Sequence, residues 1–146
     1  MSTSNPRSTT EQEIVEATRR MIAAAVLYSH QVAEQLKLGP SDAQFMTLLD
    51  VHGPLTPGNL ADLTGLKTGT VTGVLDRLEN ADFIHRTRDP HDRRKVIVTP
   101  NAAQIAARVT PHYEPQAARM LSALSRYTDD ELTLIATFLT SMTPPS

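Results

Sequence analysis

The sequence predicts a mostly α-helical fold with one small β-hairpin, and three observations support this prediction. Apolar residues recur at helical spacing over most of the 146 residues. Capping residues, glycines and prolines divide that pattern into separate helices. Between residues 83 and 99, two short strand-like segments surround a polar loop. The composition, 40% hydrophobic and 21% charged, is ordinary for a globular domain, so we expect one folding unit.

The N-terminal third predicts a tail followed by a long helix. Residues 1–10 are rich in Ser, Thr and Asn, which favours a flexible tail. Residues 11–38 read as an amphipathic helix, because apolar residues lie seven apart at Ile14, Met21 and Tyr28. Gly39 and Pro40 are expected to end it.

Two shorter helices are expected next. Ser41 to Gln44 forms the pattern of a capping box, which predicts the start of the second helix, and Gly53 and Pro54 predict its end. Thr56 followed by Pro57 predicts the N-cap and first residue of a third helix.

A turn at Thr64 and Gly65 leads into the segment KTGTVTGVLDRLE, residues 67–79. Two short helices joined by a glycine-containing turn are typical of a helix-turn-helix. The second of them should run to about Asn80, with its core face formed by Val71, Val74, Leu75 and Leu78.

The strand-like segments are residues 83–88 and 95–99, and the loop between them is DPHDRR. This loop is too polar to be buried, so we expect a hairpin that projects from the protein. Residues 83–99 carry five basic and two acidic side chains, although the whole chain has a net charge of −2. Such a local excess can attract phosphate.

The C-terminal residues 100–146 return to a helical pattern. Thr99 and Pro100 predict one helix start, and Thr128 to Glu131 forms a second capping box. Pro111 and Pro115 should kink or break the helix between these two starts. The apolar stripes of the N- and C-terminal helices have no other obvious cover, which favours packing on each other and on a second copy of the chain.

Several function classes are disfavoured. Without cysteine there is no disulfide, thiolate metal site or thiol redox sensor. The five histidines lack metal-ligand spacing, and GLKTGTVTG does not have the lysine position of a phosphate-binding loop. We therefore expect no cofactor, no metal and no enzymatic activity. No apolar run is long enough to span a membrane. Acidic Glu11, Glu13 and Glu16 precede the longest apolar run, residues 21–28, where a signal peptide would be basic, so we expect a cytoplasmic protein.

Residues 55–99, from LTPGNLADLTGL to DPHDRRKVIVT, resemble the winged helix-turn-helix of the MarR family of transcription regulators. The last of these motifs is the most specific, because it follows the family's wing pattern. The resemblance implies a winged helix-turn-helix in residues 39–99, flanked by dimerisation helices in residues 11–38 and 100–146. It also implies a homodimeric repressor that binds a pseudo-palindromic double-stranded DNA operator and is released by a small aromatic or amphipathic effector, whose binding residues the sequence does not identify.

Within this reading, the second helix of the motif enters the major groove and the hairpin enters the minor groove. Arg94 is then the minor-groove residue, and Asp92 orients it through an ion pair. We expect the DNA contacts to come from Lys67, Thr68, Thr70, Thr72, Arg77, Arg86, Arg88, Arg93 and Arg94. A winged helix that serves only as a protein-binding adaptor is the alternative.

Two positions depart from the family pattern. Gly73 stands where many members carry a long polar side chain, so this helix should make fewer direct base contacts. Asp82 stands where a glycine usually follows the helix, and aspartate tolerates the left-handed conformation better than most residues.

Overall fold

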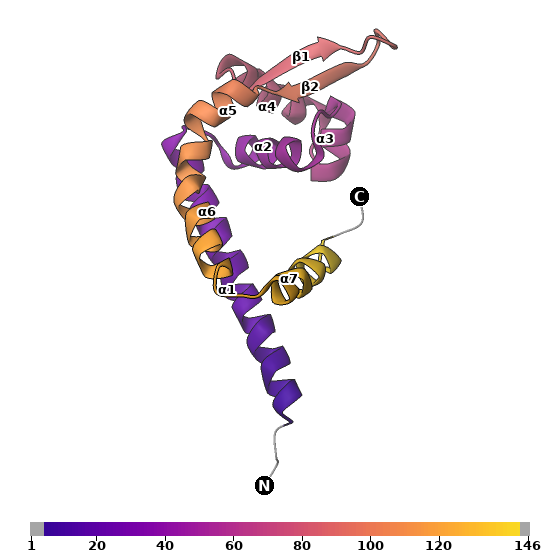
Figure 1. Cartoon of the computed structure of the whole chain (residues 1–146). Helices are drawn as coiled ribbons and strands as arrows, with labels where there is room; N and C mark the ends of the chain where they lie inside the picture. The colour runs from indigo at the N-terminus through magenta and orange to yellow at the C-terminus, as the bar shows by residue number, and fades with distance from the viewer. Residues whose placement is uncertain (1–4, 144–146) are drawn as a thin grey trace. The chain divides into compact units, whose positions relative to one another are not determined.

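A computed structural model describes residues 5–143, which form seven α-helices and one two-stranded antiparallel sheet (Figure 1). This confirms the predicted fold class, a mostly α protein with a small β wing. The chain divides into two compact units, Met1–Val109 and Thr110–Ser146. Among the described residues, no helix is sufficiently long and apolar to cross a membrane.

The first helix, α1, spans Pro6–Gln35 and begins earlier than the sequence predicts. The side chain of Asn5 accepts a hydrogen bond from the amide of Arg7, and Pro6 occupies the first helical position. Both features favour a helix start, so a helix start at Glu11 after a ten-residue tail is wrong. Residues 1–4 of that tail lie outside the described residues.

The end of α1 also differs from the prediction. Lys37 adopts a left-handed conformation with φ of 58°, and the amide of Leu38 donates to the carbonyl of Ala33 at 2.8 Å. These features define a Schellman cap, which satisfies the last carbonyls of the helix. The helix therefore ends before Gly39 is reached.

Helix α2 spans Pro40–His52, with Gly39 as its N-cap. The carboxylate of Asp42 accepts a hydrogen bond from the Gly39 amide at 2.9 Å. The capping box predicted at Ser41 is therefore wrong by two residues, because Pro40 supplies the first helical position and Asp42 reaches back to the cap.

Helices α3, Pro57–Thr64, and α4, Thr68–Asn80, form the predicted helix-turn-helix. Thr56 caps α3 through a reciprocal pair of hydrogen bonds with Asn59. The turn contains Gly65 in the left-handed conformation with φ of 70°, a backbone geometry that favours glycine.

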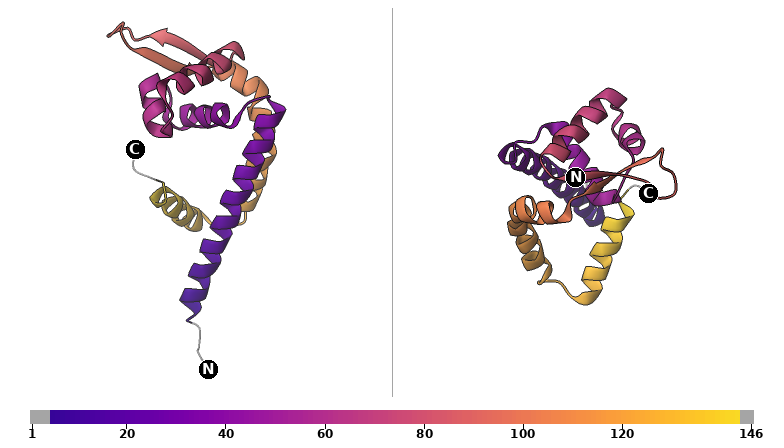
Figure 2. Two further views of the ribbon diagram at one scale, coloured as in Figure 1. Left: turned by 180° about the vertical axis from the view of Figure 1, so that it is seen from behind. Right: turned by 90° about the horizontal axis from the view of Figure 1, so that it is seen from above.

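The hairpin consists of β1, Ile84–Arg88, and β2, Val96–Pro100, which pair in an antiparallel register that aligns Arg86 with Val98. It extends away from the helices of the first unit in every view (Figure 2). Asp82 joins α4 to the hairpin with φ of 63°, which confirms that aspartate serves as the left-handed cap.

One hydrophobic core holds α2, α3, α4 and the hairpin together. Its fully buried members are Phe45, Leu49, Leu60, Val71, Val74, Leu75, Leu78, Phe83, Ile84 and Val98. The four predicted core positions of α4 are among them, so its opposite face is available to solvent. Within the described residues, Asp42 is the one buried charged side chain.

The C-terminal helices are α5, Ala102–Arg108, α6, Thr110–Leu124, and α7, Asp129–Ser141. Asn101 caps α5, so the predicted helix start at Thr99 and Pro100 is wrong; both residues belong to β2. The expected break near Pro111 is confirmed between α5 and α6, because proline has no amide hydrogen to continue the ladder. The helix does not break at Pro115, which lies inside the continuous α6. The predicted capping box at Thr128 starts α7.

Candidate nucleic-acid interface

The outward face of α4 is the first part of the candidate interface. Successive residues turn by about 100° around an α-helix, which places Gly69, Gly73 and Asp76 opposite the buried stripe. A Cβ atom at Gly69 would meet nothing within 4 Å, and one at Gly73 would lie 3.8 Å from Nη1 of Arg77. Internal packing therefore does not require glycine at either position, and the backbone of α4 is exposed at Gly69 and partly exposed at Gly73.

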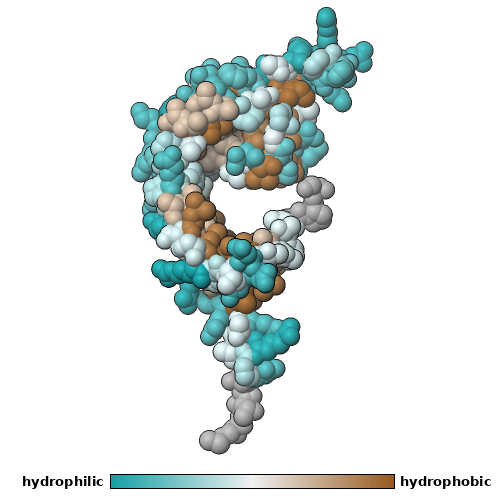
Figure 3. All heavy atoms as spheres, viewed as in Figure 1, coloured by the Kyte–Doolittle hydropathy of each residue, from teal (hydrophilic) through white to brown (hydrophobic). Residues whose placement is uncertain are grey.

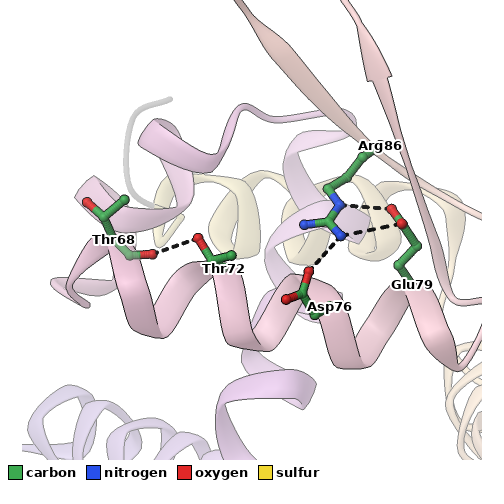
Figure 4. Close-up of polar contacts among 5 residues, drawn as sticks. All are labelled: Thr68, Thr72, Asp76, Glu79 and Arg86. Atoms are coloured by element: carbon green, nitrogen blue, oxygen red, sulfur yellow. Dashed lines mark hydrogen bonds and ion pairs between the residues drawn. The ribbon is translucent and has the colours of Figure 1, made fainter.

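The N-terminal end of α4 carries the predicted short polar contacts. Lys67, Thr68, Thr70 and Thr72 are all exposed. Lys67 is the N-cap residue but its side chain caps no amide, which leaves the helix N-terminus suited to an anion. The hydroxyl of Thr72 donates to the carbonyl of Thr68 at 3.0 Å, so towards DNA it would act as an acceptor (Figure 4).

Arg77 leaves α4 on the side of α2 and pairs with Asp42. Its Nε and Nη2 atoms donate to Oδ1 of Asp42 at 3.0 and 2.8 Å, and Nη1 has no such bond. The hydrogen bond from Arg77 to Asp42 raises the pKa of the guanidinium. Asp42 is a residue that our sequence reasoning missed, and the signal was its position three residues after the helix-stopping Gly39.

Arg86 approaches α4 from β1, on the other side of the helix. Its Nη2 atom lies 2.7 Å from Oδ1 of Asp76, and its Nε atom lies 2.9 Å from Oε2 of Glu79 (Figure 4). Hydrogen bonds to Glu79 and then to Asp76 raise the pKa of Arg86, and the same contact lowers the pKa of Glu79. The sequence predicts a phosphate contact for Arg86, whereas the structure places this guanidinium between two carboxylates.

The tip of the hairpin is held by hydrogen bonds between side chains and backbone groups. Asp89 accepts from the amides of His91 and Asp92, at 2.7 and 3.3 Å. Arg88 donates from Nη1 to the carbonyl of Arg93 at 2.9 Å. These bonds fix the loop without using the side chain of Arg93.

Asp92 does not form the ion pair that the family resemblance implies. Its carboxylate accepts from the backbone amide of Arg94 at 3.1 Å, which orients the peptide instead of the guanidinium. Arg93 and Arg94 are both exposed, and neither has an ion-pair partner among the described residues. Hydrophilic side chains cover this end of the hairpin (Figure 3).

The comparisons with known proteins agree with this geometry. The MarR family model matches residues 40–96, from α2 to the start of β2. The chain is 37% identical over 139 residues to YcgE of Bacillus subtilis, an uncharacterised HTH-type transcriptional regulator, and the match covers 95% of this chain and 90% of that protein. It is 30% identical over 128 residues to the HTH-type transcriptional repressor NicR of Pseudomonas putida, covering 84% and 78%.

Solved structures show the same fold. The S. aureus MepR–DNA complex superposes with a TM-score of 0.56 at 22% identity, covering 84% of this chain and 93% of MepR. BpsR of Bordetella bronchiseptica, whose DNA binding is described as regulated by 6-hydroxynicotinic acid, gives a TM-score of 0.50 at 24% identity over 91% and 94% of the two chains. The chain therefore belongs to the MarR family and is a DNA-binding transcription regulator rather than an enzyme.

Proposed function

We propose that the protein is a homodimeric repressor that binds a pseudo-palindromic operator and is released by a small-molecule effector. The observation that carries this proposal is the pair of exposed, unpaired arginines, Arg93 and Arg94, at the end of a hairpin that projects beside α4. A protein-binding adaptor has no need of two uncompensated guanidinium groups at such a tip.

In the proposed complex, α4 lies in the major groove. The open backbone at Gly69 and Gly73 permits a close approach to the base edges. Thr68, Thr70 and Thr72 supply short polar and methyl contacts, and Lys67 contacts phosphate at the helix N-terminus. Arg77 is the arginine of α4 that was predicted to contact DNA. Its Nη1 atom would donate to DNA, while its Nε and Nη2 atoms donate to Asp42.

The hairpin would enter the adjacent minor groove. Arg94 inserts its guanidinium where a narrow groove concentrates negative potential, and Arg93 and Arg88 contact the flanking phosphates. Because α4 has few long side chains, much of the sequence preference should come from DNA shape.

The helices outside residues 39–99 would form the dimer. Large apolar side chains remain exposed on α1, namely Ile14, Val15, Met21, Ile22, Val26 and Leu27. Others are exposed on α7 and at its C-cap, namely Leu134, Phe138, Leu139 and the cap residue Met142. Exposed apolar stripes of this kind mark protein interfaces. A two-fold dimer would present two α4 helices to half-sites about one DNA turn apart.

Repression and effector release are supported by the relatives. NicR is named a repressor, and the DNA binding of BpsR responds to an aromatic acid. An effector that binds the DNA-free conformation more tightly than the DNA-bound one would lower operator affinity. The operator would lower effector affinity by the same coupling free energy. Acting on chromosomal DNA, the protein would work in the cytoplasm.

Selection from a random-sequence duplex library tests this function, together with the mass of the protein by light scattering. We expect a mass of twice 16.0 kDa and an enriched inverted repeat with half-site centres about 10 bp apart. A monomer, or a library from which no sequence is enriched at low salt, would contradict the proposal.

A further inference from the structure

The ion-pair cluster of Arg86, Asp76 and Glu79 joins the hairpin to α4. Besides the two shortest contacts, Nη2 of Arg86 donates to Oε1 of Glu79 at 3.4 Å. Nε and Nη2 of the guanidinium are thus directed to carboxylates, and the Arg86 side chain is only 28% exposed. The cluster holds two negative charges and one positive charge, so its net charge is −1.

Asp76 lies on the face of α4 that is proposed to contact DNA, and Glu79 lies on the flank of that face. Thr68, Thr72 and Asp76 follow one another at four-residue intervals, and Figure 4 shows them along the same side of the helix. Asp76 also lies near Gly69 and Gly73, opposite the buried stripe of α4. Any DNA that contacts the glycine face therefore approaches Asp76, whose side chain is 54% exposed.

A carboxylate in this position opposes DNA binding, because phosphates and carboxylates repel each other within about a Debye length, roughly 10 Å at 0.1 M salt. Without Arg86, each protomer would present two uncompensated negative charges beside the groove. With Arg86 in place, one of the two negative charges is offset and both side chains are held against β1.

We propose that Arg86 is a positioning residue that promotes DNA binding through Asp76 and Glu79, by holding both carboxylates against β1 and offsetting one of their two charges, and does not act as a phosphate ligand. The inference rests on the proposed DNA contact of α4. It replaces the direct phosphate contact that the sequence predicts for Arg86, and it makes a different prediction for combined substitutions.

A double-mutant cycle separates the two roles, with the duplex enriched by the wild-type protein as the probe. Arg86→Gln should weaken binding about tenfold at low salt, because the homodimer then carries four exposed carboxylates without their counter-charge. In the background Asp76→Asn, Glu79→Gln, the same substitution should change affinity less than about twofold, since no carboxylate remains for Arg86 to hold against β1.

Arg88→Gln is the matched control, because Arg88 lies two residues along the same strand and its guanidinium donates to the Arg93 carbonyl instead of to a carboxylate. Its effect on affinity should be the same in both backgrounds. If Arg86→Gln weakens binding by the same factor in both backgrounds, Arg86 contacts DNA directly or supports the fold, and the inference is wrong.

Two further measurements keep the test decisive. Thermal melting and an active-fraction titration identify a variant that binds poorly because it is unfolded, in which case Arg86→Lys replaces Arg86→Gln. Lysine keeps the positive charge but not the forked geometry of arginine, so the Arg86→Lys variant should retain most of the DNA affinity. An Arg86→Lys variant that binds about tenfold more weakly than wild type, with Asp76 and Glu79 unchanged, would overturn the inference. If the wild-type protein enriches no duplex, the proposed function fails instead.

Discussion

The pairing of Arg77 with the buried Asp42 predicts a large stability effect from one substitution. Arg77→Met removes the hydrogen bonds at 2.8, 3.0 and 3.3 Å and leaves the carboxylate with the Gly39 amide as its one hydrogen-bond donor among the described residues. Asp42 is 3% exposed, so water cannot fully replace the guanidinium. Because the Arg77 side chain is 58% exposed, the cost should lie below that of a fully buried pair.

We therefore expect Arg77→Met to lower the free energy of unfolding by about 2–3 kcal/mol, between the value for one charged hydrogen bond and that for a broken buried ion pair. The melting temperature should fall by about 5–10 °C for a chain of this size. Denaturant and thermal unfolding at one fixed protomer concentration measure both quantities, since a dimer's stability depends on concentration.

Two controls identify the cause of this loss. In the Asp42→Asn background, Arg77→Met should cost less than about 1 kcal/mol, because no buried charge is left unpaired. Arg20→Met breaks a 3.1 Å pair with Glu16 on the exposed surface of α1 and should cost less than about 0.5 kcal/mol. A cost for Arg77→Met that is below about 0.5 kcal/mol, or that is unchanged by Asp42→Asn, would refute the reasoning.

Three other predictions concern DNA binding and pH. Gly73→Ala should raise the free energy of unfolding by about 0.5–1 kcal/mol, because the new Cβ meets only Arg77 Nη1 at 3.8 Å. The same substitution should weaken DNA binding by hindering the close approach of α4. An unchanged affinity would show that the glycine face does not enter the groove. Arg94→Ala should weaken DNA binding at least about tenfold. It should also reduce the slope of the logarithm of the DNA association constant against the logarithm of salt concentration by about 0.9 per protomer, as measured by fluorescence anisotropy. An unchanged slope would place Arg94 away from phosphate. Arg86 lowers the pKa of Glu79 below its ordinary 4.5. The difference in unfolding free energy between wild type and Glu79→Gln should therefore be constant above about pH 5 and should shrink as pH falls through the lowered pKa. Urea titrations that show no such change would contradict the pairing.

Local sequence signals predicted most of the fold. The core face of α4 follows from helical spacing. The left-handed backbone conformation at Asp82 follows from the tolerance of aspartate for this geometry. The errors lie at helix ends, where competing caps were available. Helices α2 and α5 start from Gly39 and Asn101 instead of from the neighbouring capping patterns at Ser41 and Thr99, and α1 starts at Pro6 within a segment whose composition favoured a tail. In each case the structure combines a preferred terminal residue with a hydrogen bond that the sequence pattern alone does not reveal.

The candidate site was less predictable than the fold. The sequence shows which side chains are basic, but not which of them have carboxylate partners. Arg77 and Asp42 are separated by 35 positions, and Arg86 and Asp76 by 10, so both pairs depend on tertiary packing. Arg93 and Arg94 have no such partners among the described residues, and for them the prediction of DNA contact stands as a proposal.

Hydroxyl-radical footprinting of the DNA that flanks the protein's own gene tests the central claim, that α4 and the hairpin together recognise an operator. The wild-type protein should protect two symmetric segments about one DNA turn apart, each with an adjoining minor-groove stretch that the Arg94→Ala variant protects less. No protection at low salt, or identical protection by the two proteins, would contradict the account.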